Sequence, residues 1–254
     1  MNKEGMKARY LRTEKRQCLK HGDYEVEVNY LPMFNVETSS ACPKCIEEFE
    51  ARDNANEALE KLKAIGIPQV LLNESVDTFK LRDEACRAAV NKVKRYIGST
   101  TRGRNLIISG DTGTGKSHLA CAVIREIHDG GRKYRHVNQI LDEIKATYSR
   151  TRGYTEERKD SIMKRYTEVD YLIIDDFDEF NATADNKKIM GDLLSARHNN
   201  QVQTILVAML RDNRKTGVSE IRDKLGSKLY RRLYERGAAI TLGSWYQEQL
   251  TLNI

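Results

Sequence analysis

Two groups of residues in this chain of 254 residues have types and spacings that suggest chemistry. The first group comprises Gly110, Asp111, Thr112, Gly113, Thr114, Gly115, Lys116 and Ser117. These residues match the pattern G-x-x-x-x-G-K-[ST], after an apolar strand-like run and before a helical pattern, which is the context the motif requires. The glycines let backbone N–H groups point inward at phosphate oxygens, and the start of the helix adds to that field. The run predicts a site for a nucleoside triphosphate.

The lysine and serine of this run predict a second, acidic half of the site. Lys116 is expected to reach the β- and γ-phosphates, and the Ser117 hydroxyl to bind Mg²⁺. Asp175 and Asp176 directly follow the apolar run 171–174. We expect Asp175 to hold the magnesium through a water and Asp176 to polarise the attacking water. The alternative is that one or both acids only cap the strand end.

The second group is Cys18, His21, Cys42 and Cys45, which form the pairs C-x2-H and C-x2-C with twenty residues between them. Three thiolates and one imidazole suit Zn²⁺ in a closed, structural tetrahedron. Metal binding would also supply the folding energy that so short a segment lacks. The alternative is a set of unpaired cysteines and a surface histidine.

The elements that must position these residues alternate from about residue 70 onward. Strand-like runs lie at 105–109, 134–137, 171–175, 204–210 and 238–242. Helical patterns lie at 116–128, 138–149, 185–199 and 219–236. The alternation predicts an α/β fold in which helices cover a parallel sheet.

The front of the chain has a different organisation. Residues 1–17 are basic and polar, and we expect them to be frayed. Apolar residues recur at helical spacing over 46–65, before a stop at Gly66 and Pro68. We therefore predict a zinc-binding domain over 1–46, a helical linker over 47–69 and an ATPase domain over 70–254.

Composition and charge indicate the cellular compartment in which this chain is expected. The formal net charge of +6 fits nucleic acid or an acidic protein surface, but many enzymes share it. No apolar run is long enough to span a bilayer, and the charged start is not a secretory signal. We expect a cytoplasmic protein with no membrane partner, in which Cys86 and Cys121 are reduced core residues.

The segments 110–120, 171–176, 203–210 and 225–233 resemble the AAA+ ATPases, and among them the helicase loaders of the DnaC/DnaI type and the transposition ATPase IstB. The resemblance covers most of 70–254. It implies a P-loop core with a minimal lid after the last strand, and ATP or ADP as the ligand. It also implies that Arg232 reaches the γ-phosphate of a neighbouring subunit, with Arg231 as the competing candidate.

Three positions depart from the pattern of this family. Met209 stands where the family usually carries an asparagine that helps to place the attacking water, and Gln247 stands where it has an arginine. Asp176 replaces a more usual glutamate and is one methylene shorter. We therefore expect a slow ATPase that works as a nucleotide switch.

The resemblance further implies the partners. The zinc-bearing front domain would grip the hexameric replicative DNA helicase, and the core would bind single-stranded DNA and self-associate in the ATP state. The alternatives are an IstB-like transposition helper and a nucleotide-binding adaptor with little hydrolysis. The candidate DNA contacts are Arg132, Lys133 and Arg135 beside Tyr134, and Arg211, Arg214 and Lys215.

Overall fold

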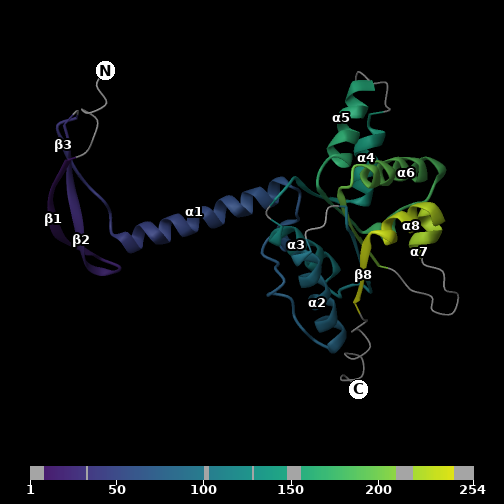
Figure 1. Cartoon of the computed structure of the whole chain (residues 1–254), viewed down its shortest axis with the longest axis horizontal. Coiled ribbons are helices and arrows are strands. Elements are labelled where there is room, and N and C mark those ends of the chain that lie inside the picture. The colour runs from purple at the N-terminus through teal and green to yellow at the C-terminus, as the bar shows by residue number, and fades with distance from the viewer. Residues whose placement is uncertain are drawn as a thin grey trace. The chain divides into compact units, whose positions relative to one another are not determined.

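The computed structural model describes residues 9–32, 34–99, 103–127, 129–147, 156–209 and 220–242. The chain divides into two compact units, Met1–Lys61 and Leu62–Ile254, which are described in turn (Figure 1). The division falls within helix α1 (Pro43–Ala64). This helix coincides with the one predicted from the apolar spacing over 46–65.

The first unit carries a three-stranded antiparallel sheet in the order β1-β2-β3. Its strands are β1 (Arg9–Cys18), β2 (Gly22–Leu31) and β3 (Val36–Ser39). The expectation that residues 1–17 are frayed is therefore wrong from Arg9 onward.

The charges of β1 form a network that explains this strand. Arg12 donates to Glu14 Oε1 at 2.9 Å and to Glu37 Oε2 at 2.9 Å. Glu14 and Arg12 lie opposite Val26 and Val28 of β2, and both valines are buried. Residues that lie directly opposite each other share one face of the sheet. We infer that the charged side chains cover the valines with their apolar stems.

The second unit is built on a five-stranded sheet in the order β5-β6-β7-β4-β8. Every neighbouring pair of strands in it is parallel. The strands are β4 (Asn105–Gly110), β5 (Arg132–His136), β6 (Tyr171–Asp175), β7 (Gln203–Ala208) and β8 (Gly237–Leu242). The predicted α/β fold with a parallel sheet is confirmed. Since the strands are parallel, their carboxyl ends meet at one edge of the sheet, which is where this fold class binds ligands.

Helices cover both faces of this sheet (Figure 1). Helices α2 (Glu84–Gly98) and α3 (Lys116–Glu126) lie on one side. The other side carries α4 (Val137–Lys145), α5 (Glu156–Thr167), α6 (Ala184–Asn199), α7 (Glu220–Leu225) and α8 (Ser227–Glu235). The helical pattern over 219–236 is interrupted because Gly226 has a φ of 81°, which separates α7 from α8.

One apolar core lies between the sheet and the second group of helices. Side chains of Ile107, Leu172, Ile174 and Leu206 come from three neighbouring strands, β4, β6 and β7, and belong to one buried cluster. Cys86 and Cys121 are buried as predicted, with 8% and 1% exposure. In the part of the chain that the structure describes, no helix has the length and apolar character needed to cross a bilayer.

One arginine on α6 ties three segments together from the inside. Arg197 is 1% exposed, and it donates to the backbone carbonyls of Tyr166, Val169 and Gln203 and to the Thr204 hydroxyl. The guanidinium therefore pairs carbonyls at the end of α5 and at the starts of β6 and β7.

We expect Arg197→Met to lower the free energy of unfolding by about 3–5 kcal/mol, because methionine fills the space but leaves buried carbonyls unpaired. Urea denaturation followed by circular dichroism measures this. Arg231→Met is the matched control, since its side chain is 75% exposed and the change should stay within about 0.5 kcal/mol. Equal midpoints for the two variants would contradict this assignment.

Candidate nucleotide-binding site and metal centre

The loop between β4 and α3 has the backbone conformation of a phosphate-binding loop. Its three glycines have positive φ angles: 150° at Gly110, 76° at Gly113 and 90° at Gly115. A Cβ at Gly110 would lie 2.7 Å from the carbonyl oxygen of Leu242, so a larger residue would collide with β8. Helix α3 begins at Lys116, which places its positive end beside the loop. Ser117 lies in the first turn of α3 and is partly buried.

Lys116 folds back over this loop, where its Nζ donates to the Asp111 carbonyl oxygen at 2.8 Å. Burial lowers the pKa of Lys116, while the carboxylates of Asp178, Asp175 and Asp176 act in the opposite direction. The structure thus brings the lysine of the loop into the field of the acids that follow β6. A bound triphosphate could replace the Asp111 carbonyl oxygen as the acceptor for Lys116 Nζ.

Asp175 is held rigidly at the end of β6. Its side chain is buried, with 1% exposure. Oδ2 accepts from the Tyr134 hydroxyl at 2.5 Å, and Oδ1 accepts from the backbone N–H of Asp176 at 2.8 Å. Burial, followed by the charge of Asp175, raises the pKa of Tyr134, so the phenol stays a donor. Sequence reasoning missed Tyr134 as a support of the acidic site.

Asp176 has an unusual backbone conformation, with φ 51° and ψ 45°. Such left-handed geometry is costly for a residue with a Cβ and is enriched at functional sites. Its Oδ2 lies 2.7 Å from His136 Nδ1, at the carboxyl end of the neighbouring strand. Burial and the charge of Asp175 raise the pKa of Asp176, and His136 opposes them. The carboxylate is therefore directed toward β5.

A third acid, Asp178, joins the ends of two strands and a helix. Its Oδ1 accepts from the backbone N–H of Met209 at 2.7 Å, and its carbonyl accepts from Lys224 of α7. The thioether of Met209 lies 2.9 Å from the Thr112 hydroxyl of the phosphate-binding loop. Met209 thus lies beside the loop, and its replacement of a water-positioning asparagine stays a prediction. Asp178 was missed because it lies beyond the paired aspartates.

The two candidate arginines lie on α8. Arg232 Nη1 donates to the Ser195 hydroxyl of α6 at 2.9 Å. Arg231 pairs with Glu235 on its own helix at 3.1 Å. Action of either arginine on a neighbouring subunit stays a prediction.

The first group of candidate DNA contacts is engaged within the fold. Tyr134 is 2% exposed, so the prediction that it offers a stacking surface is wrong. Arg135 pairs with Glu143 at 3.1 Å, and Arg132 donates to two backbone carbonyls. The physical reason is that β5 is an edge strand covered by α4, with its aromatic residue facing inward. Outside the described residues lie Arg211, Arg214, Lys215 and Gln247.

In the first unit, the predicted metal ligands gather at one point. The ligand atoms of Cys18, His21, Cys42 and Cys45 lie within 4.8 Å of one another. His21 Nδ1 is 3.7, 3.6 and 3.3 Å from the sulfurs of Cys18, Cys42 and Cys45, respectively. The sulfurs of Cys18 and Cys45 are 3.6 Å apart.

These separations fit a tetrahedral zinc site. With Zn–S near 2.3 Å and Zn–N near 2.0 Å, neighbouring ligand atoms should be separated by about 3.5–3.8 Å. Backbone hydrogen bonds from Lys20 and His21 lower the pKa of Cys18 to about 6, whereas the hydrogen bond with Cys18 raises the pKa of Cys45 to about 11. Cys18 therefore offers its thiolate most readily, and a bound cation would favour the thiolate of Cys45 as well. The outer nitrogen of His21 lies 3.1 Å from Glu48 Oε1, an arrangement that orients metal-bound histidines.

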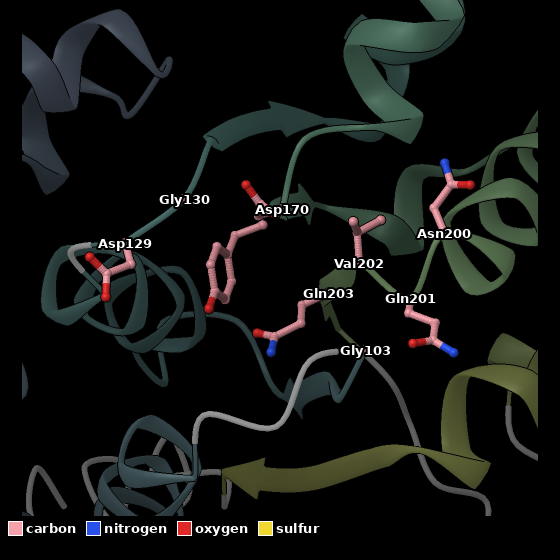
Figure 2. A pocket seen from close by; sticks show the side chains of 9 residues that line it. Gly103, Asp129, Gly130, Asp170, Asn200, Gln201, Val202 and Gln203 are labelled. Atoms are coloured by element: carbon pink, nitrogen blue, oxygen red, sulfur yellow. The ribbon is translucent and has the colours of Figure 1, made fainter.

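A separate pocket opens at the opposite edge of the five-stranded sheet (Figure 2). Its volume is about 300 Å³, and residues before β4, β5, β6 and β7 line it, among them Asp129, Asp170 and Gln201. None of its lining residues belongs to the predicted nucleotide site. The hollow that adjoins the phosphate-binding loop is a different one, of about 220 Å³, lined by Gly113, Thr114, Gly115 and parts of 74–86.

Known proteins are similar to parts of this chain in sequence. The model of the bacterial DnaA ATPase domain matches residues 77–235. A replicative helicase loader DnaC of Buchnera aphidicola (strain APS) is 26% identical over 161 residues, which cover 61% of this chain and 64% of the relative. The DnaC of Escherichia coli K12 is 23% identical over 191 residues, covering 73% of this chain and 74% of that protein. The match thus spans less than two thirds of the Buchnera relative.

Solved structures agree on the fold. The DnaC helicase loader superposes with a TM-score of 0.59 at 18% identity, over 69% of this chain and 99% of that one. DnaI superposes with a TM-score of 0.54 at 16% identity, over 70% and 95%. The replication initiator DnaA bound to AMPPCP and single-stranded DNA superposes with a TM-score of 0.53 at 19% identity, over 66% and 49%. Because the DnaA ATPase model matches more than half of the residues, this chain belongs to the family of bacterial DnaA-type AAA+ ATPase domains.

Proposed function

We propose that this chain is an ATP-dependent loader of a replicative DNA helicase. ATP binding is supported by one observation: the phosphate-binding loop, Lys116 and the acids that follow β6 all lie at the same edge of the sheet. The loop N–H groups would bind the phosphates, Ser117 and Asp175 would hold Mg²⁺, and Asp176 would activate water. The magnesium supplies charge neutralisation when it is bound.

The hollow beside the loop is the proposed place for the nucleoside. It continues from Gly113 and Gly115 to the ring of Phe79 and the side chain of Lys80. The hollow has a volume of about 220 Å³, is open to solvent and can hold a purine against the Phe79 ring. ATP would then lie across the loop, with its phosphates toward β6.

We propose that turnover is slow. Asp176 is drawn toward His136, and Met209 cannot offer the amide hydrogen bonds of an asparagine. Arg232 of a neighbouring copy would complete the site, so self-association in the ATP state is part of the proposal. The same two contacts support a second candidate, a nucleotide-binding adaptor that holds ATP with no useful turnover.

The partner half rests on the relatives named as replicative helicase loaders. The zinc-bearing first unit would capture the hexameric helicase in the cytoplasm, and the second unit would contact single-stranded DNA. Zinc would be held by Cys18, His21, Cys42 and Cys45, where it supplies structural stability.

A pull-down with ATP and with ADP tests this function. The full chain is expected to retain the replicative helicase from a bacterial extract, with a different yield for the two nucleotides. Phosphate release, measured with and without helicase and single-stranded DNA, separates the loader from the adaptor. Helicase capture that ignores the nucleotide would reject the switch, and no capture in either state would reject the loader.

A further inference from the structure

One residue of the candidate nucleotide site makes contacts that the phosphate-binding motif does not explain. His118 lies one residue after Ser117, in the first turn of α3, and is partly buried. It borders the hollow of about 220 Å³ beside the loop, together with Glu74, Thr78 and Phe79. The motif prescribes roles for the lysine and the serine, but it prescribes none for the histidine.

Both nitrogens of the His118 ring bond to the segment that forms the other wall. Nδ1 lies 2.9 Å from Glu74 Oε2, and Nε2 lies 2.8 Å from the Ser75 carbonyl oxygen. The Thr78 hydroxyl is 3.4 Å from the same Nε2. His118 thus makes several contacts with the loop that precedes α2. Residues 74–79 of this loop belong to no helix or strand.

The anchored segment carries an aromatic ring onto the phosphate-binding loop. The ring of Phe79 meets the His118 ring edge to face, with centroids 5.1 Å apart. A Cβ added to Gly115 would lie 2.6 Å from Phe79 Cε2, so the ring rests directly on that glycine. The position of the aromatic wall therefore depends on His118 and on the smallness of Gly115.

We propose that His118 is a positioning residue for the nucleoside half of the nucleotide, and so determines how much of the binding energy comes from the base and ribose. It holds segment 74–79 against the loop, and the segment then presents Phe79 to the hollow. The phosphate half would be bound by N–H groups of the loop and by Lys116, whose hydrogen bond goes to the Asp111 carbonyl oxygen and not to this segment. This inference rests on the proposed placement of the nucleoside.

The test compares ATP with inorganic tripolyphosphate, which has the phosphates without the nucleoside. For full-length His118→Ala, we expect the dissociation constant for ATP to rise about 10- to 100-fold, since the contacts of both ring nitrogens with segment 74–79 are lost. The constant for tripolyphosphate should change by less than about 2-fold. His118→Gln, whose amide keeps N–H donors, should recover part of the ATP affinity.

A second variant keeps the test decisive if His118→Ala folds poorly. Glu74→Ala removes the partner from the loop and should weaken ATP selectively too, and the double variant should lose less than the sum of the two changes. Equal weakening of ATP and tripolyphosphate, or no weakening of either, would overturn the inference while leaving nucleotide binding in place. A native chain that binds neither probe would instead defeat the proposed function.

Discussion

Lys116→Ala is expected to weaken ATP binding by at least about 100-fold, because a charge that faces the triphosphate in a partly buried site is lost. Calorimetric titration with a non-hydrolysable ATP analogue measures the change. Burial lowers the pKa of Lys116, which means that the charged form of this lysine is less favourable in the folded chain than in the unfolded chain. The variant should therefore melt no earlier than the native protein.

Lys188→Ala is the matched control for this experiment. Its side chain lies on α6 of the same unit and is exposed. Since substitutions of exposed surface side chains change stability little, both affinity and melting temperature should stay close to the native values. ATP affinity that survives Lys116→Ala would remove the basis of the proposed nucleotide site.

Removal of zinc is expected to unfold the region around the four ligands and to leave ATP binding intact. Metal binding supplies on the order of 10 kcal/mol to small zinc domains, and the sheet of the first unit buries few apolar side chains. Hydrogen exchange should show loss of protection over residues 9–46 after chelation. Cys42→Ser should lower the zinc content well below one ion per chain.

Cys121→Ala provides the comparison, because this buried cysteine lies on α3 and outside the cluster. It should keep one zinc per chain by elemental analysis. Full zinc content in Cys42→Ser, with unchanged exchange after chelation, would refute the metal centre. Helicase capture by the stripped protein would separately refute the role proposed for the first unit.

Local patterns carried most of the fold prediction. The phosphate-binding run is contiguous, so its residue types are sufficient to specify positive φ angles and a helix start. The central strands β4, β6 and β7 are buried along almost their whole length, which makes each of them a short apolar run that stands out in the sequence. The edge strand β5, with the sequence RKYRH, has no such run. The same reasoning failed for β1, because its charged residues pair across the strands and lie opposite two buried valines.

Contacts between residues that are distant along the chain could not be predicted from the sequence. Tyr134 supports Asp175 and His136 holds Asp176, although about forty residues separate the partners in each pair. The sequence showed basic residues around an aromatic ring and suggested a DNA surface. Only the placement of β5 beside β6 turns that ring inward, toward the acid.

The amino-acid order alone thus predicted a nucleotide-binding loop, a paired acidic strand end and a set of four candidate metal ligands. Strand order and the docking of segment 74–79 established which side chains support them, and these include His118 and Asp178. The reason is that a motif records the residues that must touch a ligand. Their supports can come from any element that the fold brings near, and many residue types can make the same hydrogen bond.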